Sequence, residues 1–457
     1  MILILILAFL LRFFSLNQSL WLDEATSALT TKMNLTDFFG KFLPGDFHPP
    51  LYYLVLRVCA SFFGTSEIAL RSLSIIFGIG TIYLIYLIGK KLVSCEVGIV
   101  SAILLATSGL HIYYSQEARM YSMSTFLVTL LIFSFTCLTS QKEKRTKIWW
   151  GIFTITLGLI GLTDYLPLLI LIPIWIYVLL TKRDLYFWKI FIVSHIILLF
   201  FAVIWSPTFI KQLTAGINVT SSSPSWVNVL GKFSLKDILL IPVKFMIGRI
   251  GFDSKFIYIS VVGFASAVFS FLIYRSLKDF KKLKLIYLWV LIPLGLALVI
   301  SIKLPVLNYF RFLFVLPAFY LTIASGINSL NKKPKMFFLV LILTINLITS
   351  FIYLTNQKFQ REDWKSAVSY VEKNRHSNSV VIFPANSQME VYRYYAPKAL
   401  IYGPSAIGKD YSELWLVRYA QAISDPADTT RAKVESLRYK KINELDFNGV
   451  VVWRYTR

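Results

Sequence analysis

Apolar blocks of about 20 residues recur along the chain and constrain its fold more than any other feature. Ile68–Gly89 and Phe256–Tyr274 are two of them. A helix needs about 20 apolar residues to cross the hydrocarbon core of a bilayer. The blocks are solid, whereas a membrane β-barrel would show ten-residue segments of alternating polarity. We therefore predict a polytopic, mainly α-helical membrane protein.

Eleven blocks have the composition of transmembrane helices: Met1–Leu16, Ile68–Gly89, Val97–Leu110, Met120–Thr139, Ile148–Leu162, Tyr165–Leu180, Phe187–Trp205, Phe256–Tyr274, Leu285–Ile302, Val306–Ile327 and Met336–Leu354. His48–Gly64 is also apolar, but it is short and holds Arg57 near its middle, where a charge is costly in lipid. We predict that it is an interfacial helix. Arg12 interrupts the first block, so either it snorkels to the outer interface or the true start lies upstream.

The formal net charge of +23 is carried by short basic tufts between the blocks. Nucleic-acid binding would gather these residues on one face or arm, so we expect no nucleic-acid partner. The tufts follow every second span, at Lys90–Lys91, Lys142–Lys147, Lys182–Arg183, Arg275–Lys284 and Lys332–Lys335. Basic loops mark the cytoplasmic side. We therefore predict a cytoplasmic-membrane protein with a cytoplasmic N-terminus and four outward regions: residues 17–67, 111–119, 206–255 and everything after 354.

The last hundred residues change in character. Helical spacing of apolar residues begins at Trp364, with Asp363 as the predicted N-cap. Three short apolar runs predict buried strands, and one further segment predicts a helix: Val380–Phe383, Leu414–Val417, Val450–Trp453 and Thr429–Leu437. We predict a transmembrane domain, residues 1–355, and a small soluble extracytoplasmic α/β domain, residues 356–457. The second is expected to select the acceptor or to cap the site.

An acidic pair lies in the first outward region. Trp21, Ala25, Ala28 and Leu29 share one helical face, so this segment is expected to lie on the membrane as an amphipathic helix. Asp23 and Glu24 then sit at the level of the lipid headgroups. They are either a solvated acidic pair or a functional pair in which a carboxylate takes a proton from an incoming hydroxyl.

Three further clusters map to the same side of the membrane. Each has a structural alternative: a helix start with an aromatic belt, a loop ion pair or an interfacial anchor. Their functional reading is a second catalytic acid, Glu117, and a set of ligands for an anionic headgroup, because the arginine fork binds two phosphate oxygens. Their members are His48, Tyr52 and Tyr53; Glu117 and Arg119; and Lys303, Tyr309 and Arg311, with Arg71 just inside the second span.

The ordered motifs resemble a known family. They are Trp21-Leu22-Asp23-Glu24-Ala25, then His48-Pro49-Pro50-Leu51-Tyr52-Tyr53, then Glu67…Arg71, then Tyr114-Ser115-Gln116-Glu117-Ala118-Arg119-Met120-Tyr121. This series resembles the GT-C superfamily of membrane glycosyltransferases, and more narrowly the protein O-mannosyltransferase-like family 39 with its bacterial aminoarabinose-transferase relatives. The match covers roughly the N-terminal third and extends weakly through Tyr309–Pro317.

The resemblance implies an inverting glycosyltransferase. Its donor would be a polyprenyl-phosphate-linked sugar, and its acceptor a lipid, glycan or protein outside the cytoplasmic membrane. Asp23 matches the presumed general base and Glu24 the second carboxylate of the acidic motif, and together with Glu117 they are the catalytic residues that the resemblance implies. Glu117, Arg119 and Arg71 match the charged positions of their motifs. His48 stands where aminoarabinose transferases have a lysine.

In this interpretation Arg119, Arg311, Arg71 and Lys303 stabilise the prenyl phosphate as negative charge develops on it. A divalent metal ion at Asp23 and Glu117 is compatible with the motifs, although no metal-ligand spacing predicts one. The alternative function is a transporter or flippase of an anionic lipid or lipid-linked sugar. A transporter should carry charged residues at mid-bilayer and internal repeats. Asp164 lies only at the end of a predicted span, His195 is the single titratable candidate for a mid-bilayer relay, and no repeat is found.

Overall fold

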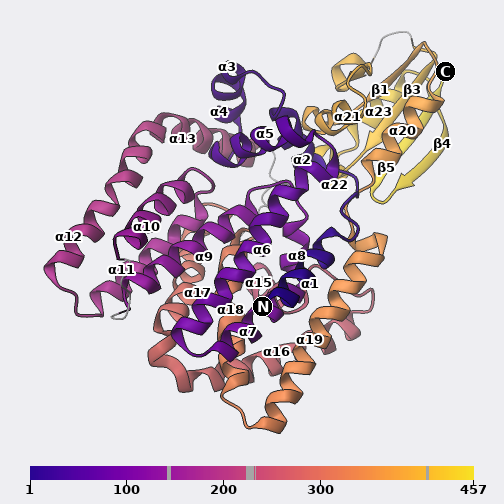
Figure 1. The fold of residues 1–457 in the computed structure, drawn as a ribbon. Helices are drawn as coiled ribbons and strands as arrows, with labels where there is room; N and C mark the ends of the chain where they lie inside the picture. The colour runs from indigo at the N-terminus through magenta and orange to yellow at the C-terminus, as the bar shows by residue number, and fades with distance from the viewer. Residues whose placement is uncertain (141–145, 223–230, 232, 408–410) are drawn as a thin grey trace.

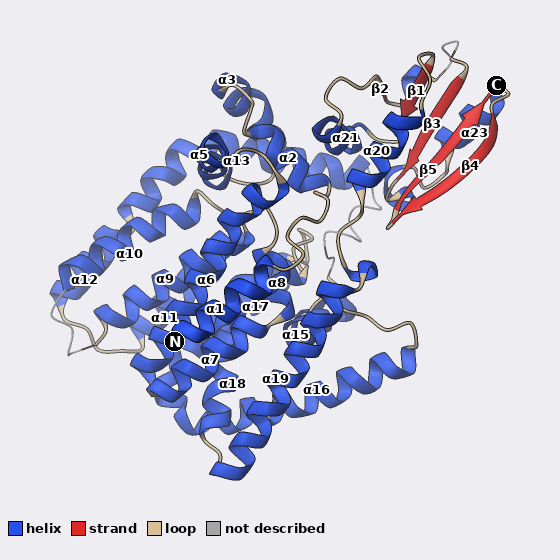
Figure 2. Ribbon diagram, turned by 45° about the vertical axis from the view of Figure 1, so that its right-hand side comes forward, coloured by secondary structure: helices blue, strands red, loops and turns tan. Residues whose placement is uncertain are grey.

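The computed structural model describes residues 1–457 except 141–145, 223–230, 232 and 408–410. Most of the chain forms a large helical body, and the last hundred residues form a smaller unit with a sheet on one corner of it (Figure 1). Figure 2 shows that the strands are confined to this smaller unit. The predicted class, a mainly helical protein with a small C-terminal sheet, is confirmed.

The helical body contains the following elements: α1 (Ile2–Phe13), α2 (Leu22–Thr30), α3 (Leu35–Asp37), η1 (Phe38–Phe42), α4 (Leu43–Gly45), α5 (Leu51–Phe63), α6 (Glu67–Leu92), α7 (Cys95–Thr107), α8 (Gly109–Ser115), α9 (Tyr121–Leu138), α10 (Thr146–Gly161), η2 (Leu166–Ile170), α11 (Leu171–Leu179), α12 (Leu185–Ser194), α13 (Ile196–Ser222), α15 (Leu235–Ile247), α16 (Lys255–Ser276), η3 (Leu277–Asp279), α17 (Phe280–Ile300), η4 (Tyr309–Val315), α18 (Leu316–Asn328) and α19 (Lys332–Thr355).

Each of the eleven predicted spans coincides with a helix or a helix pair. Within the described residues, six helical segments have the length and composition to cross a membrane, or seven when one bent pair is included. One of them, Lys255–Ile300, has 46 residues and would be about 69 Å long. It therefore contains two of the predicted spans, in α16 and α17. Three other predicted spans coincide with shorter apolar helices, so the total of eleven crossings stays a prediction.

The predicted interfacial helix is α5, which has 13 residues and would be about 20 Å long. This length is too short for the bilayer core. Its central Arg57 donates to the backbone carbonyl of Met33, so the guanidinium has a partner within the protein. The helix ends at Gly64, whose φ of +80° lies in the left-handed region that glycine tolerates best.

The third predicted span is broken, which the sequence analysis did not predict. Helices α7 and α8 meet at Ser108 with a bend of 64°. The residues predicted as a turn after this span instead form α8, and the chain reverses over residues 116–120. The break therefore sets the direction in which the Glu117–Arg119 turn is presented.

Four side-chain and backbone donors satisfy the carbonyls that the break would leave unpaired. The last four carbonyls of α7 accept, in order, from Asn346 Nδ2 at 3.0 Å, Ser108 N at 3.3 Å, Arg12 Nη1 at 3.0 Å and Ser350 Oγ at 2.8 Å. A helix end buried without such partners is unfavourable. The prediction that Arg12 snorkels to the interface is therefore wrong: its side chain is fully buried and caps α7.

Replacing Arg12 with leucine is expected to lower the melting temperature of the detergent-solubilised protein substantially. The carbonyl of Ala106, the ring of His111 and the hydroxyl of Ser115 would all lose the same charged partner. Each such hydrogen bond is worth about 1.5–3 kcal/mol. The control, Lys189→Leu on the exposed side of α12, should change the melting temperature little. Equal effects of the two substitutions would contradict this role of Arg12.

The C-terminal unit contains η5 (Gln357–Phe359), α20 (Trp364–Asn374), β1 (Ser379–Ile382), η6 (Asn386–Gln388), α21 (Met389–Tyr395), β2 (Ile401–Tyr402), η7 (Pro404–Ala406), β3 (Glu413–Arg418), α22 (Gln421–Ser424), α23 (Thr429–Ser436), β4 (Lys440–Phe447) and β5 (Val450–Thr456). The sheet has the order β2-β1-β3-β5-β4, with β1 parallel to β2 and β3 and the other pairs antiparallel. The three predicted strands and two predicted helices are confirmed, and Asp363 caps α20 by accepting from Ser366 N. Strands β2 and β4 were not predicted.

Helix α21 of the C-terminal unit packs on α2 of the helical body. The Tyr395 hydroxyl lies 2.8 Å from the backbone nitrogen of Leu20, and the Tyr394 hydroxyl donates to the carbonyl of Thr65. Ala25 of α2 belongs to the same buried cluster as Trp364 and Val381. The acidic helix is therefore held between the two units.

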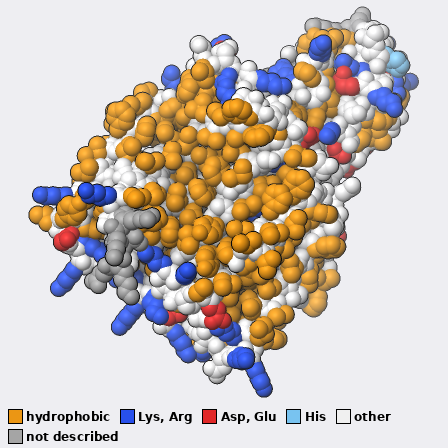
Figure 3. Space-filling view, viewed as in Figure 1, with side chains coloured by type: hydrophobic (Ala, Val, Ile, Leu, Met, Phe, Trp, Pro, Cys, Tyr) orange, Lys and Arg blue, Asp and Glu red, His pale blue; other side chains and the backbone are white. Residues whose placement is uncertain are grey.

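Lys and Arg side chains gather along the edge of the helical body that lies away from the C-terminal unit (Figure 3). The tufts at Lys90–Lys91, Arg275–Lys284 and Lys332–Lys335 all lie at helix ends. The residues Lys142, Lys144 and Arg145 of another tuft lie outside the described residues. This segregation agrees with the predicted topology, whose orientation stays a prediction.

Candidate active site

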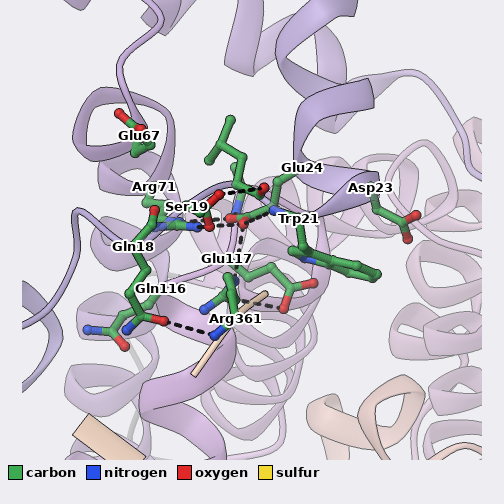
Figure 4. Close-up of polar contacts among 12 residues, drawn as sticks. Gln18, Ser19, Trp21, Asp23, Glu24, Glu67, Arg71, Gln116, Glu117 and Arg361 are labelled. Carbon is green, nitrogen blue, oxygen red and sulfur yellow. Dashed lines mark hydrogen bonds and ion pairs between the residues drawn. The ribbon is translucent and has the colours of Figure 1, made fainter. Parts of the chain in front are cut away.

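Helix α2 carries the two carboxylates of the acidic motif, and they point in different directions. Successive residues of a helix are rotated by about 100°, so Asp23 and Glu24 face different surroundings. Figure 4 shows Glu24 directed toward Arg71 and Arg361, while Asp23 points away from them. The Asp23 side chain is 38% exposed, whereas that of Glu24 is 0% exposed. Of these two carboxylates, that of Asp23 is therefore the one accessible to a substrate.

Glu24 is fully engaged by the protein. Its oxygens accept from Arg71 Nε at 2.8 Å and Nη2 at 2.6 Å, and from the backbone nitrogen of Ala118 at 2.8 Å. Burial alone would raise the pKa of this carboxyl, but Arg71 and Arg361 outweigh it and lower the pKa below its usual range. Glu24 is therefore a buried anion that joins α2 to α6 and to the Glu117–Arg119 turn.

Arg71 has no N–H group left for a ligand. Besides its two bonds to Glu24, it donates to the carbonyls of Leu16, Gln18 and Ser19 at 2.6–2.9 Å. These are all five of its donors. The structure corrects the prediction that Arg71 contacts a phosphate: its guanidinium is 1% exposed and fixes the loop that leads into α2.

Arg119 brings three of the predicted clusters together. Its Nη1 donates to the Tyr53 hydroxyl at 3.0 Å, and its Nη2 lies 3.2 Å from His48 Nδ1 and 3.8 Å from Asp23 Oδ2. The Nε atom of Arg119 is buried and has no hydrogen-bond partner among the described residues.

Asp46 completes this network and was not predicted. It accepts from the Tyr53 hydroxyl at 2.7 Å and lies 3.6 Å from His48 Nδ1. Burial would raise its pKa, but the neighbouring His48 and Arg119 hold the pKa below its usual value. Gln212 fixes the same loop by donating to the carbonyls of Leu43 and His48. Tyr52 instead pairs with Ser74 at 3.2 Å and is buried.

Glu117 is held by a residue of the C-terminal unit. Its Oε2 accepts from Arg361 Nη2 at 3.1 Å, and both side chains are 1% exposed. The other oxygen, Oε1, has no hydrogen-bond partner among the described residues. Burial raises the pKa of Glu117 to about 7, with Arg361 opposing this shift and Glu24 adding to it.

Arg249 follows α15 and is the second residue that the sequence analysis missed. Its guanidinium carbon lies 4.1 Å from the ring centre of Tyr113, and that of Arg361 lies 4.5 Å from the same ring. Arg249 is exposed although Gly248 and Ile250 on either side are buried. Such an accessible guanidinium suits an anionic ligand.

Aromatic rings connect Tyr113 to the last predicted cluster. Tyr113 contacts Tyr114 at 5.0 Å, and the rings of Tyr114 and Tyr121 both contact Phe310, at 6.0 Å and 5.3 Å. Phe310 lies between Tyr309 and Arg311, which are half-buried. Among the described residues, Arg311 donates one hydrogen bond, to the carbonyl of Pro305 at 3.1 Å. Lys303 is exposed in the turn after α17, and within the described residues no contact joins it to this site.

The carboxylates do not fit a metal site. Of the predicted pair, Glu117 is paired with Arg361 and Asp23 lies 3.8 Å from Arg119, and no group of three or more His, Cys, Asp or Glu side chains that could hold a metal occurs in the described part of the chain. A divalent ion requires several oxygen ligands with balancing negative charge.

Comparisons with known proteins agree with this architecture. A family model described as dolichyl-phosphate-mannose-protein mannosyltransferase matches residues 47–206. The crystal structure of ArnT from Cupriavidus metallidurans in the apo state superposes with a TM-score of 0.59 at 12% identity, over 99% of this chain and 97% of that one. The chain has the GT-C fold of ArnT. No curated protein sequence matches it significantly.

Two further structures share the GT-C fold. ArnT from C. metallidurans bound to undecaprenyl phosphate gives a TM-score of 0.61 at 12% identity, again over 99% and 97% of the two chains. The archaeal oligosaccharyltransferase AglB from Archaeoglobus fulgidus, in complex with an inhibitory peptide and a dolichol-phosphate, gives 0.54 at 12% identity over 99% and 74%. The GT-C resemblance inferred from the motifs is therefore confirmed at the level of the fold.

Within this GT-C fold the predicted residues form two connected groups. The accessible group contains Asp23, His48, Tyr53 and Arg119. The buried group contains Glu24, Arg71 and Glu117. Tyr309 and Arg311 flank the aromatic rings that lead to Arg249, whereas Tyr52 and Lys303 join neither group.

Proposed function

We propose that this protein is an inverting glycosyltransferase that moves a sugar from a polyprenyl-phosphate-linked donor to an acceptor outside the cytoplasmic membrane. The observation that carries the proposal is the accessible carboxylate of Asp23, placed 3.8 Å from Arg119 on a GT-C scaffold. The undecaprenyl phosphate of the matched ArnT structure and the dolichol-phosphate of the AglB structure support a lipid-linked donor. The matching family and structures are transferases, which favours this function over transport.

The reaction needs one base and a stabilised leaving group. Asp23 takes the proton of the acceptor hydroxyl while that oxygen attacks the anomeric carbon. The bond from the anomeric carbon to the phosphate oxygen breaks on the opposite face, and the prenyl phosphate leaves with the electron pair. The anomeric configuration inverts because a single displacement takes place, without an enzyme nucleophile.

The leaving phosphate gains negative charge, which guanidinium groups stabilise best when they are already in place. Arg119 is fixed beside the base by Tyr53 and His48. Arg249 and Arg311, at the two ends of the aromatic rings, keep N–H groups that the described protein acceptors do not use. We assign the phosphate to these three arginines. His48, Tyr53 and Asp46 orient Arg119.

The donor explains why the site lies in a membrane protein. Its lipid tail is costly to withdraw from the bilayer, at about 0.8 kcal/mol per methylene group. A site at the interface receives the phosphate and sugar while the tail stays in lipid. The sugar is a hexose or pentose, and the acceptor is a lipid, a glycan or a protein.

The proposal is tested with purified full-length protein and a panel of undecaprenyl-phosphate-linked hexoses and pentoses. We expect one of them to raise the melting temperature and to release undecaprenyl phosphate when cell-envelope acceptors are added. Absence of release from every member, with the protein folded, would contradict the proposed function. Movement of intact donor across vesicles without release would favour the transporter.

Replacing Arg249 with glutamine is expected to weaken binding of undecaprenyl phosphate by about tenfold or more, since a hydrogen bond to a charged group is worth about 1.5–3 kcal/mol. The shift in melting temperature with increasing lipid measures the affinity. Lys236→Gln, an exposed change on the preceding helix α15, is the control and should leave the affinity unchanged. An unaltered affinity in the Arg249 variant would remove this residue from the phosphate site.

A further inference from the structure

The C-terminal unit contributes one side chain to the interior of the helical body. Arg361 lies between η5 and α20, and its guanidinium is 1% exposed. Figure 4 shows it beside Glu117 and below Glu24. Its Nη2 donates to Glu117 Oε2 at 3.1 Å, its Nε lies 3.1 Å from Glu24 Oε2, and its guanidinium stacks on Tyr113. One residue of the C-terminal unit thus contacts both buried carboxylates.

The backbone of Arg361 is fixed from both sides. Its nitrogen donates to Gln18 Oε1 at 3.2 Å, and its carbonyl accepts from Asn448 Nδ2 at 2.9 Å. Gln18 precedes the acidic helix, and Asn448 lies in the turn between β4 and β5. The position of the guanidinium therefore depends on the docking of the C-terminal unit.

The charges around Glu117 require such a residue. Glu24 is satisfied by Arg71, whereas Arg361 is the cation that hydrogen-bonds Glu117 among the described residues. Two buried carboxylates near each other repel and favour protonation of one of them. The titratable groups that act on Glu117 come from every neighbouring element: Glu24 on α2, Tyr52 on α5, Tyr113 and Tyr114 on α8, Arg119 in its own turn, Tyr121 on α9, Arg249 after α15 and Arg361 before α20.

We propose that Arg361 is a positioning residue of the transferase site: it holds the carboxylate of Glu117 in place and in its charged form, so that the C-terminal unit is a working part of the site. Through this carboxylate, Arg361 fixes the Glu117–Arg119 turn and with it the guanidinium of Arg119 that stabilises the leaving phosphate. This step rests on the proposed function. The effect of Arg361 on the charge of Glu117 does not, and it is measured without substrate.

Infrared difference titration of the membrane-reconstituted full chain measures that charge. The C=O band that Glu117→Gln removes identifies this carboxyl group. Its titration midpoint should lie near pH 7 in the natural protein. In Arg361→Gln the midpoint should rise by about 1–3 units, because an opposite charge lowers a carboxyl pKa by this amount. Arg361→Lys keeps the charge, so its midpoint should lie close to that of the natural protein.

Transfer activity gives the second readout. Arg361→Gln should lose most of its turnover at pH 7 and recover part of it at higher pH, as Glu117 loses its proton. The acidic limb of the pH–activity profile of Arg361→Gln should move to higher pH, as the infrared midpoint does. The matched control is Lys365→Gln, which removes an exposed ion pair between the same two units, Lys365 Nζ to Glu67 Oε1 at 3.0 Å. It should keep the natural pH profile.

The outcomes separate the two proposals. A natural protein without transfer activity would contradict the proposed function. The infrared shift would still support the effect of Arg361 on the charge of Glu117. An active natural protein, with an unchanged midpoint and pH profile in Arg361→Gln, would overturn the role of Arg361. If Arg361→Gln alone does not fold, the double variant Arg361→Gln/Glu117→Gln should fold, because the unpaired buried charge is gone. Failure of both would make Arg361 a purely structural residue.

Discussion

Replacing Asp23 with asparagine is expected to reduce sugar transfer by about 10²–10⁴-fold while the protein stays folded. This is the range that a positioned general base contributes to a rate. Asparagine has nearly the same shape but accepts no proton. The side chain is 38% exposed, and its charged neighbour, Arg119, lies 3.8 Å away and is held by Tyr53 and His48 as well. The fold therefore depends little on this carboxylate.

The natural protein and the Asp23→Asn variant are compared in both turnover and binding of undecaprenyl phosphate. Release of undecaprenyl phosphate measures turnover, and the melting-temperature shift with undecaprenyl phosphate measures binding, which should persist in the Asp23 variant. Asp37→Asn is the matched control, since Asp37 pairs with Lys41 at 2.6 Å in the same outward segment. Undiminished transfer by Asp23→Asn would remove Asp23 as the base and leave the site without an accessible acid near Arg119.

The helical body could be predicted because its signal is local. A solid apolar block reports a span without reference to any other part of the chain, and all eleven blocks correspond to helices. The bend at Ser108 could not be predicted, because the donors that stabilise it come from Arg12, Asn346 and Ser350, which are distant in sequence. A helix break costs least where such partners meet it, and only the packed structure brings them there.

The C-terminal sheet shows the same limit. Buried strands β1, β3 and β5 are apolar and were predicted, whereas β4 is largely exposed and carries Lys440, Glu444 and Asp446. One signal for it was present: Asn448-Gly449, with φ values of +50° and +96°, forms the tight turn between β4 and β5. Asn-Gly is the strongest short-range hairpin signal, and it implies a strand on both sides.

The sequence predicted most residues of the candidate site but not the different roles that they have in it. Adjacent carboxylates in a motif look equivalent in sequence, yet the helix turns one to the substrate side and the other into the protein. Arg71 looked like a phosphate ligand because nothing in the sequence shows that five acceptors surround it. Arg249 and Arg361 lie outside the motifs, and only the packing of α15 and of the C-terminal unit brings them to Tyr113 and Glu117.

The buried pair of Glu24 and Arg71 should produce the largest loss of stability when one partner is removed. Glu24→Gln leaves the Arg71 charge partly unpaired, and Arg71→Leu leaves Glu24 with its remaining partner, Arg361. Breaking a buried ion pair on one side costs about 3–5 kcal/mol. We expect either variant to show a much lower melting temperature, or to aggregate during purification, and to lose activity as a consequence of misfolding.

The double variant Glu24→Leu/Arg71→Leu distinguishes a buried charge pair from simple loss of contacts. It removes both charges together, so it should be less destabilised than the sum of the single variants, as coupled neighbours are. It should not recover fully, because the carbonyls of Leu16, Gln18 and Ser19 still lose their donor. Lys358→Gln, which breaks the exposed pair with Asp253, should cost at most about 1 kcal/mol. A Glu24→Gln variant that melts like the natural protein would show that this glutamate is not the anchor of the acidic helix and would reopen its assignment as a catalytic acid.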